Sequence, residues 1–257
     1  MKKTYHLLTF LFCIVVLSAC EKNAVQKLPE GSPGAQIKFF NFAPNSPSVN
    51  FFANTDKISG TLTASGIVST TGVNYGSVFP ASNYASLKAG SYAFKGQIPE
   101  SATVDANLAI TNLQSSIDVG KFYSLYTCGI YNSTAKTTDA FIVEDVLPTA
   151  DTSAAYVRLV NSVSNSNTFS LVLKNLIGIE GIIATGVAYK SGSTFVKVPE
   201  GIYDLYARYS PSTTNVITRT GVSFLKGRVY TISARGDMTV TSTTATNRPF
   251  FDNTQNR

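Results

Sequence analysis

Histidine, cysteine and tryptophan are scarce or missing in this 257-residue chain. The one histidine is His6, and two of the three cysteines, Cys13 and Cys20, lie in the same N-terminal stretch. If that stretch is removed, Cys128 remains and no histidine does. Serine–histidine and cysteine–histidine catalysis, the usual zinc sites and an intrachain disulfide are then excluded. We expect no cofactor and no metal.

Charge is also scarce, since Asp, Glu, Lys and Arg make up 14% of the chain against about 25% in an average soluble protein. The formal net charge is +6, but the basic residues are scattered singly. A nucleic-acid-binding surface needs them clustered, so we expect no nucleic-acid partner. The hydrophobic content of 44% is enough for packed cores, and the abundant Ser, Thr and Asn favour a secreted or surface β-protein.

The N-terminus has the features of an export signal. Lys2 and Lys3 precede an apolar run, residues 7–17, which is shorter than the roughly 20 residues of a stable membrane anchor. The run ends in Leu-Ser-Ala-Cys20 and resembles the bacterial lipobox. We predict a signal peptide over residues 1–19, a lipidated Cys20, and a flexible tether over 20–34. The protein would then be held in the cell envelope, on the surface or periplasmic face of the outer membrane. An ordinary signal peptide or an uncleaved anchor is the alternative.

The remainder of the chain repeats itself. Residues 35–54 return as 155–174 at a spacing of 120 positions, with Asn41 matching Asn161. Two further blocks match at falling offsets, residues 84–94 with 195–205 at 111 and residues 120–125 with 227–232 at 107. The repeat predicts two similar domains, 35–148 and 155–257, joined by a linker over 149–154. The falling offsets place the length differences in loops, where insertions cost little.

Apolar and polar residues alternate in short segments separated by Gly, Asn and Ser turns, and no convincing amphipathic helix is present. This pattern predicts an all-β chain of two antiparallel β-sandwiches. Gly90 and Gly201 are expected at tight reversals with positive φ. Tyrosines at repeated strand positions are expected in the cores: Tyr92, Tyr123, Tyr203 and Tyr230.

Three motifs carry a family resemblance. They are an opening strand with Ile37-Lys38 or Val157-Arg158, a Gly-x-Tyr segment at Gly90 or Gly201, and a Gly-Lys/Arg-x-Tyr segment at Gly120 or Gly227. Together, over residues 35–252, they resemble the domain-of-unknown-function family 4397. The resemblance implies immunoglobulin-like sandwiches, often in tandem and often on lipoproteins. It brings no catalytic residues.

Few side chains are candidates for chemistry. Glu144-Asp145 is the best acidic cluster, but neighbours on a strand point to opposite faces. Asp145 aligns with Asp252 at the offset of 107, which favours a turn or capping role. Cys128 aligns with Arg235 and is expected to be a half-buried small residue, with a reactive thiol as the alternative.

A ligand patch is predicted at Tyr206, Arg208 and Tyr209, where aromatic and cationic side chains gather. The sequence therefore favours a non-enzymatic cell-envelope lipoprotein that serves adhesion, scaffolding or ligand capture. Its partners would be the membrane, through the lipid, and a glycan or envelope protein. The alternative is a glycan-binding accessory lipoprotein of a nutrient-uptake system. A hydrolase with an unrecognised carboxylate pair is the third hypothesis.

Overall fold

The computed structural model describes residues 34–60 and 64–257. The predicted signal peptide, the lipidation site at Cys20 and almost all of the tether lie outside the described residues. The described part is all-β, as predicted, and its residues belong to one compact unit. No helix in the described ranges is long and apolar enough to cross a membrane.

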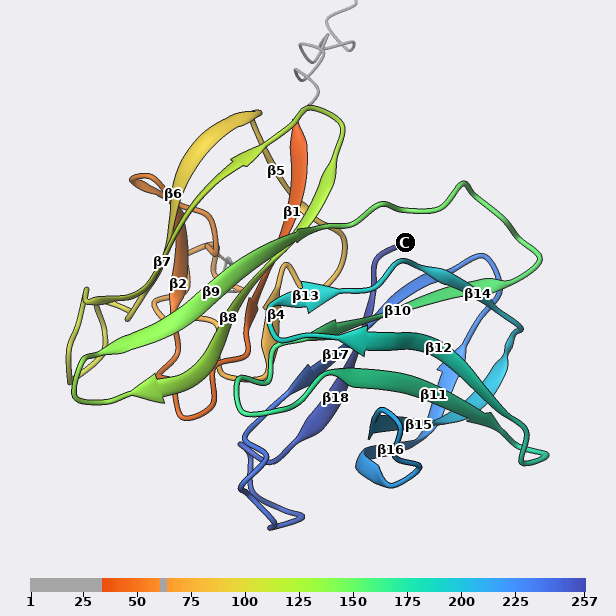
Figure 1. The fold of residues 1–257 in the computed structure, drawn as a ribbon. Helices are drawn as coiled ribbons and strands as arrows, with labels where there is room; N and C mark the ends of the chain where they lie inside the picture. Colours follow the sequence, from red (N-terminus) through yellow and green to blue (C-terminus); the bar gives the residue numbers. More distant parts are fainter. Residues whose placement is uncertain (1–33, 61–63) are drawn as a thin grey trace, which may run out of the picture. The chain divides into compact units, whose positions relative to one another are not determined.

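The N-terminal sandwich consists of two sheets. One has the order β4-β1-β8-β9, with β5 also paired to β1, and the other has the order β3-β2-β6-β7 (Figure 1). The strands are β1 (Ala35–Asn41), β2 (Asn50–Ala53), β3 (Asp56–Lys57), β4 (Ser77–Phe79), β5 (Ala85–Leu87), β6 (Gly90–Gln97), β7 (Ala109–Ile117), β8 (Phe122–Asn132) and β9 (Thr137–Glu144).

The C-terminal sandwich has the same strand orders. Its sheets are β13-β10-β17-β18, with β14 also paired to β10, and β12-β11-β15-β16. The strands are β10 (Ala155–Asn161), β11 (Phe169–Asn175), β12 (Glu180–Val187), β13 (Ser191–Gly192), β14 (Val196–Val198), β15 (Gly201–Tyr209), β16 (Asn215–Phe224), β17 (Val229–Arg235) and β18 (Phe250–Gln255). The predicted linker, residues 149–154, falls between β9 and β10 and contains no strand.

Three details differ from the sequence-based expectation. The sheets are mostly antiparallel, but β1 pairs with β8 and β10 with β17 in parallel. The segments around Gly90 and Gly201 cross from one sheet to the other instead of forming hairpins. Gly90 has a φ of 151°, whereas Gly201 is not among the residues of positive φ, so that expectation was wrong for Gly201.

Each sandwich has its own apolar core. Alternate residues of β1 and β2 fill the first, including Phe39 stacked on Phe51 at 5.0 Å between ring centroids. The second is built in the same way around Phe169 and Phe224. The four predicted core tyrosines lie in or against these cores, and each places its hydroxyl on the backbone of a nearby turn. Their repetition therefore reflects packing rather than ligand binding.

The repeated asparagines hold the first turn of each sandwich. Asn41 is fully buried and donates from Nδ2 to the Val73 carbonyl at 2.9 Å. Asn161 is also buried and donates to the Val187 carbonyl at 3.2 Å. A buried amide without such partners would be costly, so these contacts explain why both copies keep Asn.

A third apolar cluster joins the two sandwiches. Phe40, Tyr126 and Phe141 stack in sequence and lie in one buried cluster with Val160 of the C-terminal sandwich. The Tyr126 hydroxyl lies 3.2 Å from the Ser233 hydroxyl. The strands β1 and β10 are therefore buried on both faces, one in their own core and the other in this interface.

Cys128 belongs to the same interface cluster. Its side chain is fully buried, and its Sγ lies 3.3 Å from the Tyr189 hydroxyl of the C-terminal sandwich. The expectation of a half-buried residue was therefore wrong, because the outer face of β8 is covered by the second sandwich. Burial raises the pKa of the thiol to about 12, so the reactive thiolate is disfavoured.

Asp145 is the centre of a buried polar network in this interface. It forms an ion pair with Arg158 and accepts hydrogen bonds from the hydroxyls of Ser124 at 2.8 Å and Tyr84 at 2.7 Å. Asn256 Nδ2 donates to it at 3.3 Å. Asp145 is therefore an interface residue, and the predicted turn or capping role was wrong.

Strand pairing also corrects the alignment of Asp145. Its backbone N–H donates to the Phe122 carbonyl, and the backbone N–H of Asn256 donates to the equivalent Val229 carbonyl, both at 2.7 Å. Asn256, not Asp252, therefore occupies the matching position. The Asp145 carboxylate interacts electrostatically with two buried cations, Arg158 through the ion pair and Lys38 at longer range.

Candidate ligand-binding site

A pocket of about 380 Å³ lies on the outer face of the β3-β2-β6-β7 sheet. Its volume falls within the roughly 300–1,000 Å³ usual for small-molecule sites. Asn50 and Phe52 of β2 line it because Phe51 between them points into the core. Gln97 of β6 is paired with Asn50 and projects on the same side. Period-two alternation thus places an aromatic ring and two amides in one floor.

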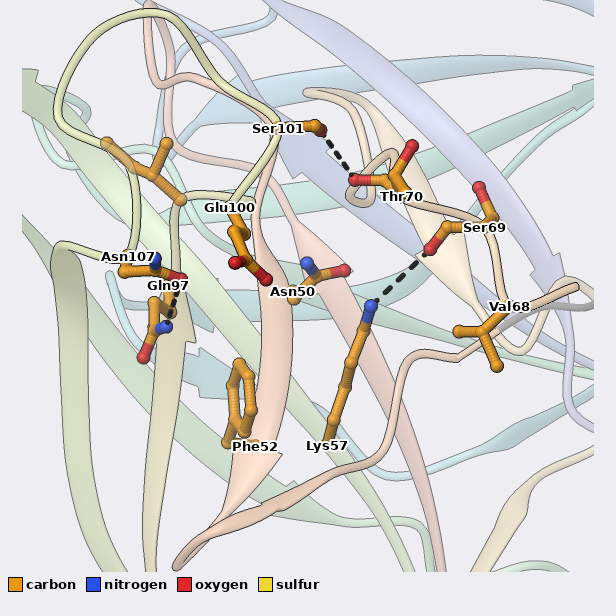
Figure 2. A pocket seen from close by; sticks show the side chains of 11 residues that line it. Asn50, Phe52, Lys57, Val68, Ser69, Thr70, Gln97, Glu100, Ser101 and Asn107 are labelled. Atoms are coloured by element: carbon orange, nitrogen blue, oxygen red, sulfur yellow. Dashed lines mark hydrogen bonds between the residues drawn. The ribbon is translucent and has the colours of Figure 1, made fainter.

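Two loops form the walls. Residues 68–70 and Lys57 lie on one side, and Ile98, Glu100, Ser101 and Asn107 lie on the other. Figure 2 shows the Glu100 carboxylate and the Asn50 amide near each other in the middle of the pocket, with the Phe52 ring beside the Lys57 stem. The pocket therefore combines one aromatic face, three amides, hydroxyls and two opposite charges.

Several of these polar groups are available to a ligand. Among the described residues, Lys57 Nζ donates to the Ser69 carbonyl alone, at 3.4 Å, and Gln97 Nε2 donates to Asn107 Oδ1 at 3.3 Å. Within the described ranges, Glu100 has neither a hydrogen bond nor an ion pair. Asn50 Oδ1 accepts from Ser59 Oγ at 3.4 Å. Among the described residues, the Glu100 carboxylate, the amide oxygen of Gln97 and the amide nitrogen of Asn50 therefore remain free to bind a ligand.

The loops are held in place by specific contacts. The backbones of Val49 and Val73 exchange two hydrogen bonds, of 2.7 and 3.1 Å, next to Gly72. A Cβ on Gly72 would lie 2.7 Å from the Val49 backbone, so only glycine allows this approach. On the other wall, Asp105 forms an ion pair of 2.6 Å with Lys136 of the β8–β9 turn. Ser101 Oγ donates to the Thr70 carbonyl at 2.9 Å and joins the two walls.

The same two loops contain the extra length of the first copy. By strand pairing, the offset between the two copies falls from 125 at Lys57 to 114 at Ser77, across the loop 58–76. It falls from 111 at Gly96 to 106 at Thr111, across the loop 98–108. Insertions on a rigid sheet commonly carry binding residues. The falling offset was thus the one sequence signal that pointed to this pocket, whereas the residue types of its floor gave none.

The predicted patch at Tyr206 and Arg208 occupies the equivalent place in the C-terminal sandwich. Arg208 pairs with Ser170 of β11 as Gln97 pairs with Asn50, and Tyr206 pairs with Val172 as Lys95 pairs with Phe52. There, however, Glu180 of the edge strand β12 (Glu180–Val187) binds the Arg208 guanidinium through two hydrogen bonds of 2.7 and 2.8 Å.

The structure does not bring all three predicted patch residues together. Tyr206 and Arg208 share the outer face, with the guanidinium 5.4 Å from the Tyr206 ring centroid. Tyr209 lies on the opposite face and stacks on Phe169 at 5.4 Å. Because Arg208 is already paired and Tyr206 is 9% exposed, this patch offers less to a ligand than the pocket in the N-terminal sandwich. Ligand binding by these residues stays a prediction.

The acidic candidates do not form a catalytic pair. Asp145 is buried behind Arg158, and Glu144 forms an exposed ion pair with Lys121 at 3.1 Å. Among the residues that the structure describes, no group of three or more His, Cys, Asp and Glu is placed to hold a metal ion.

The fold and the site define an all-β protein of two packed sandwiches with a pocket on the outer face of one sheet. The chain belongs to the family described as Domain of unknown function (DUF4397), which it matches over residues 35–172, just over half its length. No curated protein matches it. Among solved structures, the Bacillus anthracis TIE protein is 12% identical with a TM-score of 0.24. That likeness covers 80% of this chain and only 34% of the TIE chain.

Proposed function

We propose that this protein is a non-enzymatic, lipid-anchored envelope protein that captures a neutral saccharide in the pocket of its N-terminal sandwich. The observation that carries the proposal is the combination of Phe52 with Asn50, Gln97, Asn107 and the unpaired Glu100 around one cavity. Adhesion and scaffolding, the wider alternatives, do not by themselves require such a cavity.

The chemistry of the lining favours a sugar. A sugar hydroxyl both donates and accepts, and amide side chains and a carboxylate supply matching acceptors and donors. The face of an aromatic ring suits the apolar C–H face of a pyranose. Lys57 and Glu100 are the charged lining residues, and their charges cancel, so the pocket has no net preference for an ionic ligand.

The number of carboxylate side chains in the pocket supports binding of the saccharide without hydrolysis. Glycoside hydrolysis usually needs two carboxylates about 5–10 Å apart. Glu100 is the one carboxylate among the lining residues. The hydrolase hypothesis would therefore need a second acid from outside this pocket.

The binding test uses the full-length protein on a glycan array, followed by calorimetric titration of each hit. We expect Phe52→Ala and Glu100→Gln each to weaken binding by about tenfold or more, because tenfold corresponds to about 1.4 kcal/mol. Arg208→Ala is the matched control, since Arg208 stands where Gln97 stands in the other sandwich. Loss of binding in Arg208→Ala alone would move the site to the predicted Tyr206–Arg208 patch. Turnover of a bound glycan, abolished by Glu100→Gln, would replace capture by hydrolysis.

Lipid anchoring is tested separately at Cys20, which supplies the thiol for the predicted lipid. Cys20→Ala should shift the protein from the membrane to soluble or precursor fractions. An unchanged distribution would refute the lipoprotein assignment and leave the saccharide proposal standing. Protease treatment of intact cells then distinguishes the surface from the periplasmic face.

A further inference from the structure

Three arginines surround one aromatic ring in the C-terminal sandwich. The guanidinium carbons of Arg219, Arg235 and Arg248 lie 5.4, 5.3 and 5.1 Å from the centroid of the Phe250 ring. Like charges gathered at this spacing repel each other unless acids compensate them. The partners of each guanidinium therefore decide what the cluster can bind.

The compensation is incomplete. Arg235 forms an ion pair with Asp252. Arg219 Nη1 donates to the Phe251 carbonyl at 2.7 Å, and Arg248 Nη1 donates to the Ala245 carbonyl at 2.9 Å. Across the described ranges, neither Arg219 nor Arg248 has a carboxylate within ion-pair distance. Arg248 thus keeps most of its five N–H donors for another partner.

Arg248 lines a cavity of about 570 Å³ beside this cluster. The hydroxyl-bearing side chains of Thr218, Thr241 and Thr243 line it as well, and no other described residue hydrogen-bonds to these three hydroxyls. The remaining wall includes the apolar side chains of Met238, Val240 and Phe250. A guanidinium with adjacent hydroxyl donors matches an oxyanion, to which Arg binds through two parallel hydrogen bonds.

The wall of the cavity is a preformed loop, residues 236–249, between β17 and β18. The Asn165 side chain donates to Asp237 Oδ1 at 2.8 Å and accepts from the Met238 N–H at 3.1 Å. Asn247 donates to Asn45 Oδ1 at 3.0 Å. A Cβ on Gly236 would collide with the Arg248 carbonyl oxygen, so glycine allows the start of the loop to lie against its end. A fixed loop lowers the entropic cost of binding.

This loop is longer than its counterpart in the N-terminal sandwich. By strand pairing, the offset is 107 at Tyr123 and Tyr230 but 111 at their partners Glu144 and Gln255. Each sandwich therefore carries a cavity beside its own insertion. The first cavity has balanced charges, and the second has an unpaired guanidinium.

We propose that the cavity at Arg248 is a second ligand site, which binds an oxyanion group (a carboxylate, sulfate or phosphate) carried by a small ligand. Arg248 holds the oxyanion, the threonine hydroxyls complete its coordination, and the apolar wall covers the body of the ligand. The site acts independently of the saccharide pocket in the N-terminal sandwich.

The test titrates full-length protein with sodium glucuronate, sulfate or phosphate at constant ionic strength, followed by the NMR resonances of residues 238–250. We expect a saturable shift, and we expect Arg248→Gln to weaken binding at least tenfold. Arg228→Gln is the matched control, because it removes the same charge from a residue that lines a different cavity. Thr218→Val is a second variant that leaves every charge in place and should weaken binding several-fold.

Equal weakening by Arg248→Gln and Arg228→Gln would show general charge attraction and overturn the proposal, as would the absence of saturation with all three anions. Preference for glucuronate assigns a carboxylate ligand, and preference for sulfate or phosphate assigns a tetrahedral one. Amide spectra that change only near the substituted residue verify that each variant is folded. If the glycan experiment shows no binding at the Phe52 pocket, the anion titration still tests the Arg248 site, because the two sites are independent.

Discussion

Replacing Lys38 with Met should stabilise the protein at neutral pH. Lys38 is fully buried in the interface between the sandwiches, and its ammonium has no hydrogen-bond partner in the described ranges. Its nearest favourable contact is the Tyr84 ring, 5.0 Å away at the centroid. Asp145, the one nearby carboxylate, is already paired with Arg158. A buried charge in this state costs free energy that an unbranched apolar side chain does not.

The size of the effect follows from the pKa. Burial, partly opposed by the charge of Asp145, lowers the pKa of Lys38 from 10.5 to about 8. At 1.36 kcal/mol per pKa unit, this shift corresponds to a penalty of about 3 kcal/mol when the folded protein must hold the proton. The lost contact with the Tyr84 ring offsets up to about 2 kcal/mol of the gain. We therefore expect Lys38→Met to raise the free energy of unfolding by about 1–3 kcal/mol at pH 7.

The pH dependence has a defined sign. Between about pH 8 and 10.5, the unfolded chain binds the Lys38 proton and the folded chain releases it. The wild-type protein therefore gains stability as pH rises through this window, whereas the variant gains none from this residue. The difference between the two proteins should shrink from pH 7 to pH 10. Some tyrosines also titrate near pH 10, but they contribute equally to both proteins, so their effect cancels in the difference in unfolding free energy.

Urea unfolding at pH 7, 8, 9 and 10 measures this difference. Arg158→Met is the matched control, because Arg158 occupies the equivalent strand position but is paired with Asp145. Its loss should destabilise the protein by roughly 3–5 kcal/mol, the usual cost of breaking a buried pair. A Lys38→Met variant less stable than wild type at pH 7, or a difference that does not change with pH, would refute the reasoning.

Three further predictions concern other contacts. Asp145→Asn should also cost roughly 3–5 kcal/mol of unfolding free energy; a loss below about 1 kcal/mol in urea titration would show that the ion pair is not buried in solution. Cys128 should resist Ellman's reagent at pH 8 in the native protein and react in urea, because burial raises its pKa to about 12; fast native labelling would contradict the closed interface. Gly72→Ala should weaken saccharide binding at least tenfold while the far-UV circular dichroism is kept, because its Cβ would displace the wall beside Val49; unchanged affinity would separate that wall from binding.

Local patterns were sufficient for the all-β class and for much of the core. The alternation of apolar and polar residues in short segments predicted strands with one inward face, because a strand has period two. In β2 and β11 the apolar residues Phe51 and Leu171 lie in the cores accordingly. The repeated tyrosines were correctly assigned to packing for the same reason. Their contacts are made to nearby turns of the same sandwich, so they leave a signal that a single sequence can carry.

The remaining features depend on strands and loops that are far apart in sequence. Asp145 was aligned with Asp252 by offset, but its backbone hydrogen bond matches that of Asn256, since the length of the loop between β17 and β18 differs from that of the β8–β9 turn. Cys128 was expected to be half-buried because nothing in the local sequence shows that a second sandwich covers it. The pocket at Phe52 forms because two inserted loops, far apart in sequence, lie over the same face of one sheet. Sequence alone therefore determined the strands and their inward faces, and the packing of sheet on sheet decided the interface and the sites.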